Sequence, residues 1–220
     1  MLIMTKYSNL SDTIQKILDQ SPAIRVNMSR GLINIRALAK YMIKERKIDA
    51  SLDAVISAIR RYNVDAYDYI FENALNLIRK SLSISTMSSL VIITATKDDE
   101  IQKLLPRLFS VIHYSQGNVL RIIQANEAIK IIIDEKNLEK ILEFFPRGNI
   151  LNIEKHLAEI NLRVHLDAKY TLGVSAIISN ELAINGINII ETMSCFPEAI
   201  WFIEEKDLLK AYSALDRLRK

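Results

Sequence analysis

The chain has 220 residues, of which 50% are apolar and 25% charged, with one cysteine; this length can bury a core in one large domain or in two or three small ones. A single cysteine excludes an intramolecular disulfide and a metal site that needs two thiolates, which indicates a reducing setting inside the cell. Residues 1–12 lack a signal pattern and no run approaches the roughly 20 apolar residues that span a bilayer, so we expect a cytoplasmic protein without a membrane partner.

Charge is distributed unevenly along the chain. Residues 1–80 hold 13 lysines and arginines against 8 acidic residues, a net charge of +5, whereas residues 81–220 hold 16 against 18, a net charge of −2. A basic amino-terminal part therefore precedes a mildly acidic body. DNA is a candidate partner of the first part only.

Residues 10–81 show apolar residues at helical spacing and almost no alternation. This pattern predicts an all-helical unit over residues 1–82, with helices that begin near Leu10, Pro22, Asn34, Ser51 and Asp65. Proline is tolerated in the first turn of a helix, and asparagine and serine are good amino-terminal caps.

Two of these helices, INIRALAKYMI and SLDAVISAIRRY, resemble a helix-turn-helix. Ala39 is small enough for two helices to cross closely, and in such motifs the amino-terminal half of the second helix faces the bases. Polar and basic side chains of this pair are the candidate DNA contacts: Arg36, Lys40, Ser51, Ser57, Arg60 and Arg61. Asp53 opposes contact with a phosphate-rich groove, so a helical dimerisation or docking unit with solvated basic residues is the alternative.

From Ser88 the pattern changes to short runs rich in isoleucine and valine, separated by helical segments, which is typical of an α/β or α+β unit. We expect a strand, SSLVIITAT, then a helix over residues 98–114, the hairpin VLRIIQA and AIKIIID, and a helix through Leu138. After a short run, ILNIEKHL, the order repeats. The second series is the strand EINLRVHL, a helix over residues 173–185, the hairpin INIIETM and EAIWFIE, and a helix over residues 207–219.

The repetition is visible in the letters themselves. The triplet EAI recurs after 71 positions, at residues 127–129 and 198–200, and EKNL at residues 135–138 returns as EKDL after 70 positions. This period is longer than a solenoid repeat and predicts two copies of a small domain, at residues 86–157 and 158–220. A βαββα copy with an extra edge strand makes a ferredoxin-like sandwich, so the expected fold class is α+β.

The second copy, through LGVSAIISNELAINGINIIE and EAIWFIEEKDLLKAYSAL, closely resembles an ACT domain, as found in tandem at the end of aspartokinases. The resemblance implies a small-molecule effector, an amino acid, bound between two such domains. The residues that match the family's ligand positions come from one loop and from the start of the next strand: Asp167, Thr171, Leu172, Gly173, Val174, Ser175, Asn188 and Ile189. The first copy enters its helix through TATKDD without a glycine, so its ligand loop is absent or altered.

The residues of this loop allow the same chemistry. Gly173 opens a helix whose free N–H groups and positive dipole end suit a carboxylate, and it lets a ligand approach the main chain closely. Ser175 can add a hydroxyl donor, and Asp167 can accept from an ammonium group. In the opposing interpretation Gly173 only permits a turn, Asn188 only caps another, and the sheet serves dimerisation alone.

Nothing in the sequence indicates catalysis, a metal or a cofactor. The three histidines are dispersed, Cys195 has no evident base, and no glycine-rich phosphate loop is present. We therefore expect a stand-alone regulatory protein rather than an enzyme, with a transcriptional regulator as one form of it, and a homodimer because such sheet edges commonly pair. The alternative is a non-sensing scaffold or accessory subunit of a metabolic enzyme.

Overall fold

The computed structural model describes residues 10–63, 65–81 and 83–220 and, of residues 65–70, only the backbone. The chain divides into two compact units, Met1–Ala74 and Leu75–Lys220, which we call the helical unit and the sheet unit. The expected end of the helical unit, residue 82, lies outside the described residues, as do residues 1–9. No helix in the described part of the chain is both long and apolar enough to cross a membrane.

The helical unit is built from short helices around one apolar core. Their bounds are α1 Leu10–Asp19, α2 Pro22–Ser29, α3 Ile35–Glu45, α4 Leu52–Arg60 and α5 Asp65–Arg79, the last of which continues into the sheet unit. Leu18, Met42, Val55 and Ile59 are fully buried in this core. Ala39, expected at a close helix crossing, is also fully buried, on α3 where that helix packs against α4.

Three of these helices begin at the predicted local signals. Pro22 is the first residue of α2. The Asn34 side chain accepts a hydrogen bond of 3.0 Å from the N–H of Ala37, and the Ser51 hydroxyl accepts one of 3.3 Å from the N–H of Ala54. Each cap satisfies an N–H that has no partner inside its own helix. The predicted starts of α2, α3 and α4 are thus confirmed.

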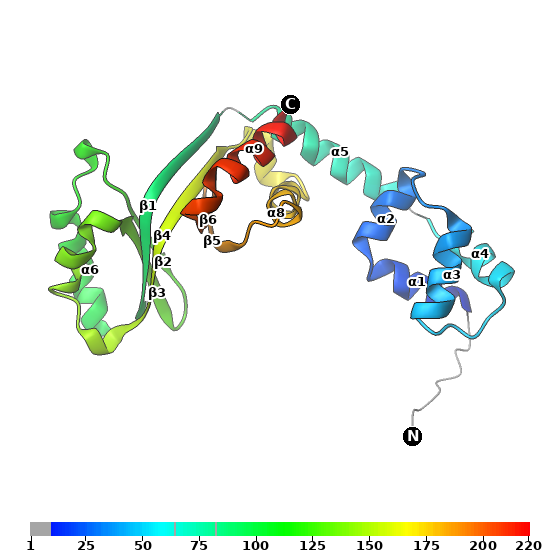
Figure 1. The fold of residues 1–220 in the computed structure, drawn as a ribbon, viewed down its shortest axis with the longest axis horizontal. Coiled ribbons are helices and arrows are strands. Elements are labelled where there is room, and N and C mark those ends of the chain that lie inside the picture. The colour runs from blue at the N-terminus through cyan, green and yellow to red at the C-terminus, as the bar shows by residue number, and fades with distance from the viewer. Residues whose placement is uncertain (1–9, 64, 82) are drawn as a thin grey trace, which may run out of the picture. The chain divides into compact units, whose positions relative to one another are not determined.

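The sheet unit contains one six-stranded antiparallel sheet in the order β2-β3-β1-β4-β6-β5. Its elements are β1 Ser83–Thr96, α6 Asp99–Val111, β2 Leu120–Gln124, β3 Ala128–Asp134, α7 Leu138–Leu142, β4 Ile150–Arg163, α8 Val174–Ile184, β5 Ile189–Cys195, β6 Glu198–Glu204 and α9 Leu208–Arg219. Figure 1 shows β1 and β4 side by side, with α6 on one side of them and α8 and α9 on the other. The expected α+β class, with helices first and an antiparallel sheet after them, is confirmed.

The two long strands, of 14 residues each, are shared by both copies of the repeat. Residues 90–96 of β1 pair with β3, and residues 157–163 of β4 pair with β6. The first half of the unit thus has strands in the order β2-β3-β1-β4 under α6 and α7. The second half has the order β1-β4-β6-β5 under α8 and α9. Each half therefore has three strands of its own, and its fourth strand is one end of the long strand that belongs to the other half.

The structure corrects the expectation that two separate segments precede α8, because β4 is one continuous strand. The runs ILNIEKHL and EINLRVHL, predicted as separate segments, form this single strand, since no glycine or proline interrupts residues 150–163. The division expected between residues 157 and 158 therefore falls inside a strand. His165, placed in the predicted strand, instead follows it, and its Nδ1 accepts a hydrogen bond of 3.3 Å from the N–H of Asp167.

The long strands bend at equivalent places. Ser89 and His156 are each the seventh residue of their strand, and both have left-handed backbones, with φ of 56° and 57°. The pairing register of β1 with β4 shifts around Leu90. Extra residues of this kind bend a strand and increase its twist, so the sheet can curl at its middle.

The curl brings the two ends of the sheet together. Lys130 on β3 pairs with Glu191 on β5, although strands four places apart would be about 19 Å apart in a flat sheet. Arg121 on β2 likewise donates two hydrogen bonds, of 2.8 and 2.7 Å, to the carboxylate of Glu159 on β4. The bond to Glu159 is the main cause that raises the pKa of Arg121 above its ordinary value.

Both faces of β1 are consequently buried. Val91 and Ile93 face a core covered by α6 and α7, whereas Leu90 and Ile92 face an inner core between the halves that also contains Phe202 of β6. Alternating side chains point to opposite faces of a strand. Burial on both faces explains why the segment from Leu90 to Ile93 is apolar without interruption.

Candidate functional site

The loop between β4 and α8 leads to a helix start that is open. The chain leaves β4, forms a 3-10 turn at Leu166–Tyr170 and enters α8 through Gly173, which has a left-handed backbone with φ of 89°. Among the described residues, no side chain caps the first N–H groups of α8. These groups and the positive end of the helix dipole therefore face the loop.

A pocket of about 430 Å³ lies at this helix start. Three parts of the chain line it, namely the end of β4 with the following loop, the first turn of α8, and the hairpin between β5 and β6. The lining residues are Val164, Ala168, Lys169, Thr171, Leu172, Gly173, Val174, Ser175, Ala176, Ser194, Phe196, Glu198 and Ala199. A smaller pocket of about 230 Å³ shares Ser175 and Ser194 with it and extends to Trp201.

The pocket presents positive charge to a ligand. The ammonium of Lys169 lies 5.7 Å from the centre of the Phe196 ring, near the free N–H groups of the helix start. The carboxylate of Glu198 accepts a hydrogen bond of 3.1 Å from Asn161, on the face of β6 that it shares with Ile200 and Phe202 and that lies opposite to the face of Trp201 and α8. The arrangement therefore suits a small molecule that carries a carboxylate.

The hairpin is held beside the loop by a main-chain contact. The N–H of Val164 donates a hydrogen bond of 2.9 Å to the carbonyl oxygen of Pro197. This bond positions Phe196 and Glu198 against the α8 start, although more than 20 residues separate them from Gly173 in the chain.

The structure divides the predicted site residues into two groups. Five of them line the pocket: Thr171, Leu172, Gly173, Val174 and Ser175. The hydroxyl of Thr171 donates to the carbonyl oxygen of Asp167 at 2.9 Å and so stabilises the turn. Asp167, whose side chain is 76% exposed, has its carboxylate 3.4 Å from Nδ1 of His165 and lies outside the lining.

Asn188 and Ile189 lie at the other end of α8. This helix has 11 residues, a length of about 16 Å at 1.5 Å per residue. Asn188 is exposed and Ile189 begins β5, three residues after the turn at Gly186 that closes the helix. Within one chain these two residues and the pocket are therefore apart.

Sequence reasoning missed the contributions of Lys169, Ser194, Phe196 and Glu198. In the sequence, Glu198 stood out only as the first residue of the repeated triplet EAI. No pattern in the neighbouring residues connects it with the loop before α8. The position of the hairpin depends on β6 pairing with β4 through residues 157–163, which is a long-range contact.

The corresponding helix start in the first half is closed by its own side chain. The carboxylate of Asp98 accepts hydrogen bonds from the N–H of Ile101 at 2.9 Å, from the Thr96 hydroxyl at 2.6 Å and from the Asn149 amide at 2.6 Å. The bond from Thr96, followed by that from Ile101, holds the pKa of Asp98 below its usual range. This carboxylate occupies the position where an anion would bind at the start of α6.

The candidate DNA contacts are spread over two helices of the helical unit. Arg36 and Lys40 are exposed on α3, and Ser57 and Arg60 are exposed on α4. The hydroxyl of Ser51 is used as a helix cap. The guanidinium of Arg61 donates a hydrogen bond of 3.2 Å to the hydroxyl of Ser11 on α1, so Arg61 connects two helices of the unit.

Acidic, histidine and cysteine side chains do not gather into a metal site in the part of the chain that is described.

The comparisons with known proteins agree with this fold. No family model and no curated protein matches the chain. Among solved structures it is similar to the aspartate kinase of Clostridium acetobutylicum, with a TM-score of 0.51, 17% identity and coverage of 63% of this chain and 34% of that one. It is similar to the ligand-free regulatory subunit of aspartate kinase from Thermus thermophilus, with a TM-score of 0.51, 14% identity and coverage of 64% and 99%. The regulatory subunit from Thermus flavus gives a TM-score of 0.51, 13% identity and coverage of 64% and 99%.

The chain thus spans about a third of the Clostridium enzyme and almost all of each Thermus regulatory subunit. At these identities the likeness shows a common fold. It supports the ACT-like resemblance seen in the sequence.

Proposed function

We propose that this chain has a regulatory rather than a catalytic role and senses a small metabolite in the pocket at the start of α8. The observation that carries the proposal is the contrast between the two helix starts. Asp98 fills the start of α6, whereas the start of α8 is uncapped among the described residues and opens into a pocket of about 430 Å³. An α-amino acid is the proposed ligand class.

The proposed binding mode uses the positive charge of the pocket. The ligand carboxylate lies at the free N–H groups of Val174 and Ser175, where the helix dipole favours an anion. Lys169, at the rim, adds positive charge next to the carboxylate.

A homodimer would complete this site. Asn188 and Ile189 match the family's ligand positions but lie at the far end of α8 from the pocket, so in this proposal a second copy supplies them. A ligand held between two copies would favour one arrangement of the dimer, because it binds that arrangement more tightly than the other. We propose that the protein forms this homodimer in the cytoplasm.

The helical unit is the proposed output of this sensor. Residues 1–80 carry a net charge of +5, and the exposed Arg36, Lys40, Ser57 and Arg60 are the proposed contacts to DNA. Binding to mixed genomic fragments should then be strongest at low salt and weaken as salt rises, since phosphate contacts release counterions. Absence of binding at low salt would favour the alternative, a docking unit.

The direct test is calorimetry and thermal-shift measurement of the full chain with the twenty amino acids. A ligand that binds only the native state raises the melting temperature. We expect Lys169→Ala to weaken binding by about tenfold, because it removes a positive charge next to the ligand carboxylate. Lys155→Ala, which removes an exposed lysine of β4 away from the pocket lining, is the matched control and should leave affinity unchanged.

If none of the twenty amino acids binds to the wild-type chain or raises its melting temperature, the result would contradict the sensing role and favour the non-sensing scaffold. Equal loss of affinity in Lys169→Ala and Lys155→Ala would place the ligand elsewhere.

A further inference from the structure

The second helix of the first half is much shorter than its counterpart. α7 has five residues and α9 has 12, although both begin at equivalent leucines, Leu138 and Leu208, 70 positions apart. The chain turns away at Pro146. The amino-terminal part of β4 consequently lacks the cover that additional helical turns would give it, and Ile150 and Ile153, which face this core, are only partly buried.

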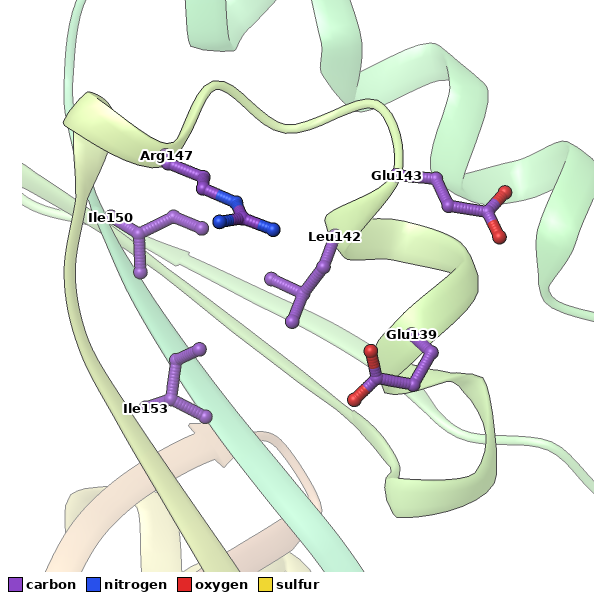
Figure 2. A pocket seen from close by; sticks show the side chains of 6 residues that line it. All are labelled: Glu139, Leu142, Glu143, Arg147, Ile150 and Ile153. Atoms are coloured by element: carbon purple, nitrogen blue, oxygen red, sulfur yellow. The ribbon is translucent and has the colours of Figure 1, made fainter.

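A cavity of about 390 Å³ is found at this place, between α7 and β4. Its lining consists of three apolar and three charged residues: Leu142, Ile150, Ile153, Glu139, Glu143 and Arg147. Figure 2 shows the apolar side chains of Leu142 and Ile153 directed toward each other from α7 and β4. The floor of the cavity is therefore apolar, while its rim is charged.

Arg147 extends over this floor. Figure 2 shows its guanidinium between Ile150 and Leu142, and the carboxylate of Glu139 turned toward the opening below Leu142, whereas Glu143 points away. No hydrogen bond or ion pair joins Arg147 or Glu139 to another side chain in the described ranges. Two opposite charges thus border one apolar surface without neutralising each other.

We infer that this cavity is a second small-molecule site, which takes an α-amino acid with an apolar side chain. The planar guanidinium of Arg147 matches a carboxylate with two parallel hydrogen bonds. Glu139 accepts from the ammonium, and Leu142, Ile150 and Ile153 contact the apolar side chain. The Glu139 carboxylate disfavours a phosphate, which would bring a larger negative charge beside it.

This site is separate from the pocket at the start of α8. The lining residues of the two pockets are all different, and they belong to different halves of the sheet unit. The inference therefore does not depend on the proposed function.

The test is isothermal titration calorimetry of the full chain with four probes. These are leucine, phenylalanine, leucinamide, which lacks the carboxylate, and 4-methylpentanoate, which lacks the ammonium. We expect leucine and phenylalanine to bind and leucinamide to bind at least about tenfold more weakly, because it loses the bidentate contact to Arg147. Glu139→Gln should weaken leucine binding and leave 4-methylpentanoate binding unchanged.

Substitutions test whether leucine binds in this cavity. Arg147→Gln should weaken leucine binding by about tenfold or more. Arg217→Gln, at the position 70 residues further on, removes an exposed arginine that bonds to Asn185 and should leave binding unchanged. Lys169→Ala, in the α8 pocket, should also leave it unchanged.

Two results would overturn the inference. One is that neither leucine nor phenylalanine binds with a dissociation constant below about 10 mM, a free energy weaker than about −3 kcal/mol. The other is binding that survives Arg147→Gln but is lost in Lys169→Ala, which would place the ligand in the α8 pocket and support the proposed function instead.

Discussion

In the first half of the sheet unit, the helix after the long strand begins with Asp98, and that carboxylate fills the helix start itself. In the second half the equivalent helix begins with Gly173, and the pocket in front of it is open. For the second helix of each half the situation is reversed, and the first half is the one left open. α9 has 12 residues, whereas α7 has five and leaves a cavity beside β4. Each half is thus closed where the other is open, which shows how two copies of one fold can carry different binding sites.

Partly buried ion pairs join the two halves, and the largest expected effect comes from breaking one. The Glu159 side chain is 5% exposed and holds Arg121 by two hydrogen bonds. We expect Glu159→Ala to lower the free energy of unfolding by about 3 kcal/mol, since removal of one partner leaves a partly buried charge unpaired. Urea denaturation measures the change.

Lys155→Ala, an exposed change on the same strand, is the control and should shift the unfolding free energy by less than about 0.5 kcal/mol. Similar urea midpoints for the two variants would mean that Arg121 and Glu159 contribute nothing to holding the halves together.

A smaller effect is expected from making the second half resemble the first. Gly173→Asp places a carboxylate at the start of α8, as Asp98 does for α6, and it should weaken binding of a carboxylate ligand by about tenfold or more through repulsion and direct competition. Titration calorimetry with the best ligand of the amino-acid panel measures this loss.

Gly173→Asn is the matched control, because asparagine meets the same left-handed backbone and also caps helices but has no charge. If both variants lose affinity equally, backbone geometry rather than charge would explain the loss.

The smallest expected effect concerns acid stability. The pKa of Asp98 is lowered by its hydrogen bonds to Thr96 and to the N–H of Ile101. A carboxyl whose pKa is lower in the folded state stabilises that state above its unfolded pKa, and the contribution is lost as pH falls through the folded value. Asp98→Asn, which keeps a capping oxygen, should therefore lose less stability than the wild type between about pH 5 and pH 2.

Asp99→Asn is the neighbouring control, because Asp99 is exposed. Its melting temperature should follow the wild-type pH dependence, and parallel curves for Asp98→Asn and the wild type would contradict the assigned role of Asp98.

Most of the secondary structure could be predicted because its signals are local. Asn34 and Ser51 cap the helices that follow them, and the apolar runs of the two hairpins became β2, β3, β5 and β6. The predicted break inside β4 was wrong, because the strand continues through Glu159 without interruption. The structure places Glu159 against Arg121 of β2, and no pattern within β4 indicates this partner.

The site was predictable to a similar extent. Thr171 to Ser175 are adjacent in the chain, and a glycine before a helix is a local signal, so the sequence identified that side of the pocket. Lys169 lies in the same loop but had no distinguishing pattern. Glu198 and Phe196 come from a hairpin whose position follows from strand pairing and from the bond between Val164 and Pro197.

The sequence by itself determined the order of the elements, the helix caps, the 70-residue repeat and the difference between Gly173 and Asp98, because each depends on residues close together in the chain. Only the tertiary structure decided that β1 and β4 are shared and that the sheet curls until Lys130 meets Glu191. It also decided that the short α7 leaves a cavity under Arg147. The physical reason is that these contacts join distant segments, and their geometry depends on register, twist and helix length acting together.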